Sequence, residues 1–249
     1  MSAAAGRTLI ALVAVATAVV WLLLGELPWP ARAYTTFLLA PLPALLLLQA
    51  RLVRQIPEDA EREAIYISSA ASVWILAGLA MLAARFGGIT RLELRAVSLP
   101  PGPLLTAAAL TTAAGLAIMG AGRLLRVRES ALVDYLIPES TPEKIAYTGL
   151  SVTAGIGEEL VFRSFLIAAL LTATGSLAAA VAISVAIFAL AHAYQGVAGT
   201  IRVALLGLVL TAPFLLTGSV YPSMIAHTVL DLIAGLALAD WLRGADGPA

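Results

Sequence analysis

Residues 145–171 read IAYTGLSVTAGIGEELVFRSFLIAALL, an apolar stretch whose only charged side chains are Glu158, Glu159 and Arg163. A helix needs about 20 apolar residues to cross a hydrocarbon layer about 30 Å thick, and this stretch is long enough. Charges at that depth are costly, so the three together indicate a paired or functional cluster.

Segments of similar character recur along the whole chain, which is 61% hydrophobic and only 12% charged, with a mean hydropathy of +0.96. A water-soluble fold could not bury that much apolar surface. The sequence therefore predicts an all-α polytopic membrane protein, a single membrane domain over residues 1–249. About eight transmembrane helices are expected, at residues 9–24, 34–48, 65–84, 104–118, 145–171, 177–193, 197–216 and 220–238.

Composition excludes several classes of function. The chain has no cysteine, so disulfides, thiolate zinc sites and cysteine nucleophiles are ruled out. Its 15 basic and 15 acidic residues cancel, which leaves no basic patch for nucleic acid. The expected partner is the lipid bilayer; the oligomeric state is not encoded in any pattern that we recognise.

Two segments near the N-terminus carry specific signals. Pro41 and Pro43 remove backbone donors and should kink the second segment. The first segment has the alternative of being a signal peptide, because Ala31-Arg32-Ala33 resembles a cleavage site. We favour an uncleaved helix, since the apolar run exceeds a usual signal core and Trp21 and Trp29 suit an interfacial belt.

The loops differ in positive charge, which predicts the orientation. Eight crossings place both termini on one side with the loops after the second, fourth and sixth helices. The positive-inside rule makes that side cytoplasmic and the protein a multi-pass protein of the cell membrane. Its basic residues are Arg7, Arg51, Arg54, Arg62, Arg123, Arg126, Arg128, Lys144 and Arg243, against Arg32, Arg85, Arg91 and Arg95 on the other side.

Two features are expected before the fifth helix. Ser140-Thr141-Pro142-Glu143 has the pattern of a capping box with an early proline, so that helix should begin there. The loop over residues 122–144 is amphipathic and either lies along the interface or is a plain linker.

The apolar segments retain few ionisable residues, and both histidines of the chain are among them. Arg202 lies near a helix start, where its side chain can snorkel, and is assigned no role. The remaining pairs can hold helices together, because Glu159 and Arg163, like His227 and Asp231, are four residues apart. This leaves Glu158 unpaired on its own helix. Adjacent carboxylates in a low dielectric resist ionising together, which is one way to make a general base. The candidate site residues are Glu158, Glu159, Arg163, His192, His227 and Asp231.

Three motifs carry a family resemblance. Glu158-Glu159-Leu160-Val161-Phe162-Arg163 resembles the EExxxR motif of the CAAX prenyl protease and bacteriocin-processing (CPBP, or Abi) family of intramembrane proteases. Phe188-Ala189-Leu190-Ala191-His192 matches its FxxxH motif, and His227-Thr228-Val229-Leu230-Asp231 matches its HxxxN or HxxxD motif. The resemblance covers residues 141–242, which we expect to be the catalytic core, and points to the type II CAAX prenyl endopeptidases.

The resemblance implies an intramembrane endopeptidase, with a membrane-tethered or prenylated peptide or protein as substrate. Glu158 would activate the attacking water, His192 would share that task, and Glu159 with Arg163 would brace the base. His227 and Asp231 would complete the pocket. Many relatives have asparagine where this chain has Asp231, which donates only when protonated. Oxyanion stabilisation then falls to His227, Arg163 or a metal.

The metal requirement and the reaction class have alternatives. Glu158, His192 and His227 could ligate zinc or another divalent metal with one position open, although no HExxH pair exists. A metal-free glutamate mechanism is equally compatible. The motifs of other intramembrane proteases are absent: Ser219 is a weak serine nucleophile, and only Asp231 is an aspartate within a span. The competing functions are a non-catalytic membrane scaffold or bacteriocin-immunity-type protein of the same family, and a small proton-relay transporter.

Overall fold

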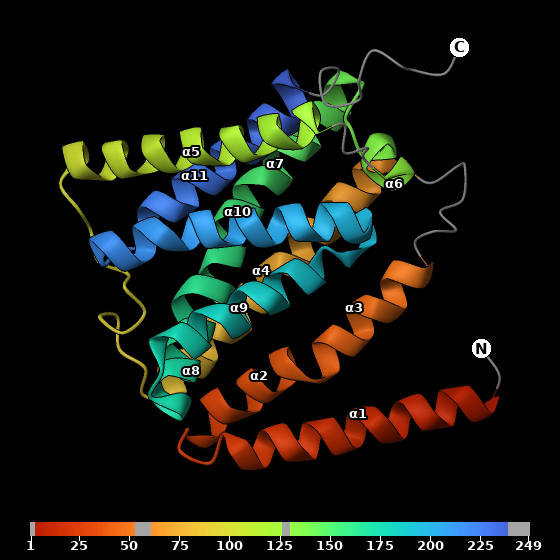
Figure 1. The fold of residues 1–249 in the computed structure, drawn as a ribbon, viewed down its shortest axis with the longest axis vertical. Helices are drawn as coiled ribbons and strands as arrows, with labels where there is room; N and C mark the ends of the chain where they lie inside the picture. The colour runs from red at the N-terminus through yellow and green to blue at the C-terminus, as the bar shows by residue number, and fades with distance from the viewer. Residues whose placement is uncertain (1–2, 53–60, 126–129, 239–249) are drawn as a thin grey trace.

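The computed structural model describes residues 3–52, 61–125 and 130–238, and these residues form helices and connecting loops without a β-strand (Figure 1). The predicted all-α class is confirmed. The α-helices are α1 Ala3–Leu23, α2 Trp29–Leu39, α3 Pro41–Leu52, α4 Arg62–Phe86, α5 Pro101–Leu124, α6 Ala131–Tyr135, α7 Thr141–Glu158, α8 Ile167–Thr174, α9 Leu177–Ala191, α10 Gly196–Thr217 and α11 Tyr221–Leu232. Two π-helical segments, η2 Glu159–Leu166 and η4 Ile233–Ala237, and the 3₁₀ turn η3 Ala193–Gln195 complete the described helical structure.

Each of the eight predicted apolar segments is helical. Five stretches of the described residues are long and apolar enough to cross a membrane: Gly6–Leu23, Trp29–Ala50, Arg62–Phe86, Pro101–Leu124 and Ala193–Thr217. The apolar helices at Leu177–Ala191 and Tyr221–Ala237 are shorter. The fifth segment is longer than predicted, because α7, η2 and α8 follow one another without a break from Thr141 to Thr174. The chain is a multi-pass membrane protein.

The predicted proline kink lies between α2 and α3. The second span changes direction at Ala40, whose backbone leaves the helical region at φ −127° and ψ −66°. Pro41 follows directly and has no amide hydrogen, so it can begin a new helix but cannot continue the old one.

The segment α7–η2–α8 lies at the centre of the bundle. The α7 helix packs mainly against α4 and α11, while η2 is contacted by α4 and α9. Large apolar side chains point outwards, with Leu216 85% and Ile10 71% exposed, whereas Glu159 is 0% and Arg163 1% exposed. This inverted distribution suits a protein whose outer surface meets lipid.

Helix α7 approaches α11 closely at Gly155. A Cβ on Gly155 would lie 2.7 Å from the backbone nitrogen of Thr228, one residue after His227, whereas a Cβ on Gly149 of the same helix meets nothing within 4 Å. Small residues at helix crossings allow such contact in membranes.

The variant Gly155→Ala is expected to lower the free energy of unfolding by about 1–3 kcal/mol, because the helix backbones must separate to admit the methyl group. Gly149→Ala is the matched control and should leave stability unchanged or slightly higher. Unfolding in a titration from mild detergent into dodecyl sulfate measures both variants. Equal stability of the two would show that the close crossing is not required.

The start of α7 is fixed by the predicted capping box. The Ser140 hydroxyl accepts a hydrogen bond from the Glu143 amide, and the Glu143 carboxylate accepts from the amides of Ser140 and Glu139. These amides hold the pKa of the Glu143 carboxyl below its usual range. The stabilisation is therefore present above the ordinary glutamate pKa and is lost as the pH falls through the lowered value.

A strap formed by α6 and residues 136–140 is tied to α4. The Arg62 guanidinium donates to the Tyr135 carbonyl and pairs with Glu139 and Glu143, and the Tyr66 hydroxyl donates to the Leu136 carbonyl. The amphipathic loop thus contains a short helix held against the bundle. Its residues Arg126, Val127 and Arg128 lie outside the described residues.

The helix ends divide into two sets, as an alternating path requires (Figure 1). The right-hand side of Figure 1 holds the starts of α1, α4, α7 and α10 and the ends of α3, α5, α9 and α11. Arg7, Arg62, Arg123 and Lys144 lie at this end, which carries the predicted cytoplasmic charges. Arg54 and Arg243 lie outside the described residues.

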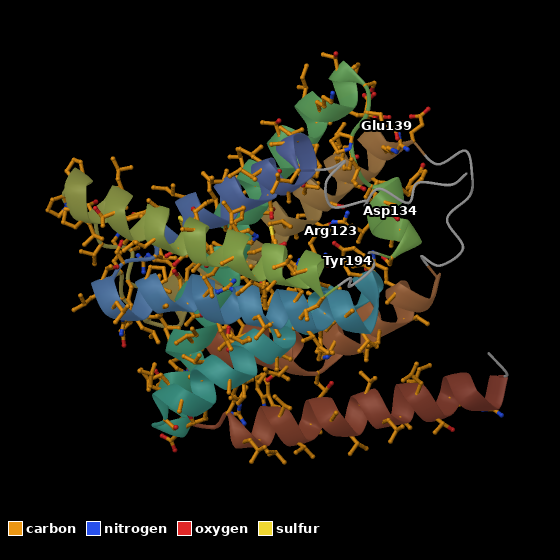
Figure 2. The ribbon with its side chains drawn as sticks, turned by 45° about the horizontal axis from the view of Figure 1, so that its top comes forward. Arg123, Asp134, Glu139 and Tyr194 are labelled. Atoms are coloured by element: carbon orange, nitrogen blue, oxygen red, sulfur yellow. The ribbon has the colours of Figure 1, made fainter. Side chains whose placement is uncertain are left out.

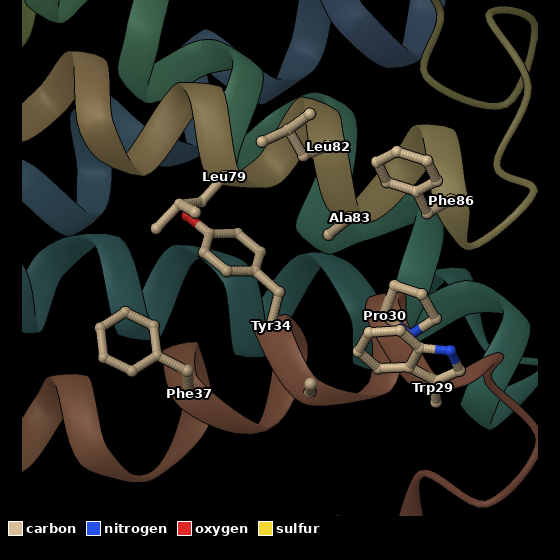
Figure 3. A pocket seen from close by; sticks show the side chains of 9 residues that line it. Trp29, Pro30, Tyr34, Phe37, Leu79, Leu82, Ala83 and Phe86 are labelled. Atoms are coloured by element: carbon tan, nitrogen blue, oxygen red, sulfur yellow. The ribbon is translucent and has the colours of Figure 1, made fainter.

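An apolar groove of about 480 Å³ lies between α2 and α4 (Figure 3). It is lined by Trp29, Pro30, Ala33, Tyr34, Phe37, Leu79, Leu82, Ala83 and Phe86. The Tyr34 hydroxyl donates its hydrogen bond to the Leu76 carbonyl and so does not offer a donor to the groove. None of the candidate site residues lines this groove.

Candidate active site

The acidic pair lies where the central helix changes its winding. Helix α7 ends at Glu158, and the π-helical segment η2 begins at Glu159 and includes Arg163. A π-helical stretch inside a longer helix is rare and occurs frequently at functional sites. The change of winding directs two neighbouring carboxylates differently: Glu159 is fully buried, while the Glu158 side chain is 17% exposed.

Glu159 joins three elements of the bundle. Its Oε1 accepts a hydrogen bond from Arg163 Nη1 at 2.9 Å and another from His227 Nδ1 at 2.8 Å. Arg163 Nη2 donates to the Gly207 carbonyl of α10 at 3.2 Å. Such charge-assisted bonds are the stronger kind, and removing one partner would leave a buried charge uncompensated.

Phe188 is the apolar centre of the site. The Arg163 guanidinium lies 4.2 Å from its ring centroid, the His192 ring lies at 4.9 Å and the His227 ring at 6.1 Å. A cation over an aromatic face is favourable in a desolvated site. His192, which caps α9, and His227 of α11 therefore both contact the same phenylalanine ring.

Glu158 and Asp231 face the free side of the His227 ring. His227 Nε2 lies 3.9 Å from Glu158 Oε2 and 3.7 Å from Asp231 Oδ2, too far for direct hydrogen bonds but suited to a bridging water. Glu158 Oε2 is buried without a hydrogen-bond partner among the described residues. A buried acceptor left unpaired is costly, so this oxygen is a place where a water or substrate group would be bound.

His192 ends α9 and has a defined tautomer. Its Nδ1 lies 2.9 Å from the Phe188 carbonyl, which can only accept, so the proton is on Nδ1. In the neutral ring Nε2 then carries a lone pair and can accept a proton.

The structure brings the six predicted residues into one region but redistributes their contacts. The Glu159–Arg163 pair is present as predicted, although it braces His227 and not Glu158. The sequence also paired His227 with Asp231, which is four residues further along. In the structure Glu159 holds Nδ1 of His227, and Asp231 lies 3.7 Å from Nε2. Glu159–Arg163 and His227–Asp231 have the same spacing of four residues, so nothing in the sequence indicated that their contacts would differ.

Three contributors were not found from the sequence. The Gly207 carbonyl and the Phe188 ring both hold Arg163, and a Cβ on Gly207 would lie 3.2 Å from Phe188, so glycine permits this packing. Tyr194 lies two residues after His192, with ring centroids 6.0 Å apart. In the sequence, Tyr194 could have been singled out as a site residue by its position two residues after the FxxxH motif.

The proposed metal set of Glu158, His192 and His227 does not fit the observed arrangement. Among the residues that the structure describes, no group of three or more histidine, aspartate and glutamate side chains is placed to hold a metal ion. His192 Nδ1 and His227 Nδ1 are both held by protein acceptors, which leaves the Nε2 atom of each ring. We therefore derive no reaction step through a metal.

Fold and site together define a polytopic α-helical membrane protein with a buried carboxylate and imidazole cluster. Residues 142–233 match the model of the family described as "Type II CAAX prenyl endopeptidase Rce1-like", a family of peptide hydrolases. The predicted resemblance to the type II CAAX prenyl endopeptidases is confirmed, and all three motifs lie within the matched residues. No curated protein and no solved structure matches the chain.

Proposed function

We propose that this protein is an intramembrane endopeptidase in which Glu158 activates water for hydrolysis of a peptide bond. The observation that carries the proposal is the buried, unpaired Oε2 of Glu158, 3.9 Å from His227 Nε2. A water between these two atoms would be oriented and deprotonated by Glu158. The match over residues 142–233 supports peptide hydrolysis as the reaction class.

The proposed reaction consists of an attack by water on the peptide bond and a proton transfer through Glu158 to the leaving amine. The water oxygen attacks the scissile carbonyl carbon while its proton passes to Glu158, and the carbonyl electron pair becomes an oxyanion. The carbon–nitrogen bond then breaks as Glu158 returns the proton to the leaving amine. His227 stays oriented by Glu159, and His192 Nε2 is a second proton acceptor beside the cluster. No metal is required by this sequence of steps.

The family match favours a prenylated peptide or protein as substrate, cut near its carboxyl end. His192 and η3 lie at the end of the bundle that carries Arg62, Arg123 and Lys144, which we take as the cytoplasmic end. A lipid-tethered substrate would then bring its peptide to the site from the cytoplasmic leaflet.

Purified wild-type protein in lipid nanodiscs is expected to cleave an internally quenched peptide whose cysteine, three residues from the carboxyl end, carries a farnesyl thioether. The same peptide without the farnesyl group is the matched control and should be cleaved far more slowly, because the lipid group concentrates the substrate at the bilayer. A chelator should leave the rate unchanged. Mass spectrometry locates the bond that is cut.

Failure of the wild-type protein to cleave either peptide would contradict the proposed function and favour the membrane-scaffold alternative. Loss of cleavage on chelation, restored by zinc, would overturn the metal-free mechanism while leaving the endopeptidase.

A further inference from the structure

The reaction above needs a hydrogen-bond donor for the oxyanion, and the cluster offers few. Arg163 is 1% exposed. Its Nη1 donates a hydrogen bond to Glu159, and its Nη2 donates one to the Gly207 carbonyl. His227 Nδ1 donates to Glu159 and His192 Nδ1 to the Phe188 carbonyl. His227 Nε2 faces Glu158 at 3.9 Å and Asp231 at 3.7 Å. Ionised carboxylates only accept. A donor from outside the three motifs would add to the few that the cluster holds.

Tyr66, Tyr147 and Tyr194 lie in this part of the bundle, and they differ in the hydrogen bonds that their hydroxyl groups make. The Tyr66 hydroxyl donates to the Leu136 carbonyl, and the Tyr147 hydroxyl donates to the Asp231 carbonyl. The Tyr194 hydroxyl instead accepts a hydrogen bond from Gln195 Nε2 at 3.4 Å and donates none to the described residues. Its own proton is therefore available to a bound group.

The turn that carries Tyr194 places this side chain next to His192. Helix α9 ends at Ala191, His192 caps it, and η3 begins at Ala193, so His192 and Tyr194 belong to the same tight bend. The bend is packed against α3, α6 and α10. The ring centroids of His192 and Tyr194 lie 6.0 Å apart.

A second view of the molecule agrees with this placement. Figure 2 shows Tyr194 at the end of the bundle that also holds Arg123, the end of α5, and Asp134 of α6. This is also the end where the strap tied by Arg62 and Tyr66 lies. A peptide reaching Glu158 from this end would pass the Tyr194 hydroxyl.

From these observations we infer that Tyr194 donates its phenolic proton in a hydrogen bond to the oxyanion of the tetrahedral intermediate. No bond to Tyr194 forms or breaks: the phenolic proton stays on the tyrosine, while Glu158 carries the proton from water to the leaving amine. This inference rests on the proposed function.

The variant Tyr194→Phe is expected to lower kcat by about 100-fold with KM unchanged, as removal of one oxyanion donor does in other hydrolases. A phosphonamidate analogue of the tetrahedral intermediate should bind more weakly by a similar factor, whereas affinity for the cleaved product should be unchanged. Tyr66→Phe is the matched control: it also loses one hydroxyl donor, but that donor serves a backbone carbonyl outside the site.

A purely structural role would give different results. Equal kcat in Tyr194→Phe and wild type, or equal losses in Tyr194→Phe and Tyr66→Phe, would overturn the inference. If Tyr194→Phe does not fold, 3-fluorotyrosine is introduced at position 194. This residue keeps the hydroxyl donor, so kcat should stay at the wild-type value. A loss of kcat of about 100-fold in that protein would overturn the inference. Absence of cleavage by the wild type, or full cleavage by Glu158→Gln, would contradict the proposed function itself and so is distinguishable.

Discussion

The variant Glu158→Gln is expected to lower kcat by about 10²–10⁴-fold, the usual contribution of a general base. Glutamine keeps the size and one acceptor oxygen of the side chain but cannot take a proton from water. The Glu158 side chain makes no hydrogen bond with the described residues, and its Oε2 stands 3.9 Å from His227 Nε2. Its loss should therefore leave the fold intact while removing the reaction.

The matched control for Glu158 is Glu93→Gln, which removes a carboxylate outside the helices. Among the described residues, the Glu93 carboxylate accepts hydrogen bonds from the amide and hydroxyl of Thr90 alone, so this variant should cleave the farnesylated peptide at the wild-type rate. Rates are compared at equal amounts of folded protein. A Glu158→Gln protein that cleaves as fast as Glu93→Gln would remove Glu158 from the mechanism.

Replacing Arg163 by methionine is expected to give the largest loss of stability, about 3–5 kcal/mol in the free energy of unfolding. Methionine fills a similar volume but leaves Glu159 buried with His227 as its remaining partner. The Gly207 carbonyl loses Arg163 and keeps the Thr211 hydroxyl as a donor. Arg85→Met removes an exposed arginine at the end of α4 and should be nearly neutral. Unfolding from mild detergent into dodecyl sulfate measures the difference.

A second substitution separates the lost charge balance from lost packing. In Arg163→Met combined with Glu159→Gln, both buried charges are gone, and much of the stability should return. Cleavage should stay low in the double variant, because an amide holds the His227 ring less firmly than a carboxylate does. Equal stability of Arg163→Met and Arg85→Met would show that the buried pair is not a structural element.

Most of the fold could be predicted because membrane spans obey a simple length and polarity rule. Every predicted apolar segment is helical, and the kink at Pro41 follows from the missing amide hydrogen. The capping box at Ser140 also fixed the start of α7 correctly. The predictions erred at helix ends: α5 begins at Pro101 and runs to Leu124, whereas the predicted segment covered residues 104–118.

The site could be predicted as a set of residues but not as a set of contacts. Spacing along one helix suggested the Glu159–Arg163 pair correctly, because neighbours four apart share a face. The hydrogen bond from His227 to Glu159 joins residues 68 apart and depends on the crossing of α7 and α11 at Gly155. No local pattern contains that information. Tyr194 escaped notice for the same reason, since a tyrosine in a turn has no spacing rule.

The most direct test of water activation by Glu158 is a single-turnover cleavage in water enriched in ¹⁸O, followed by mass spectrometry of both the product and the peptide of the protein that contains Glu158. If Glu158 acts as a base, the label enters the new carboxyl end of the product and the Glu158 carboxylate stays unlabelled. Label in the Glu158 carboxylate would instead demand a covalent anhydride and would contradict the mechanism.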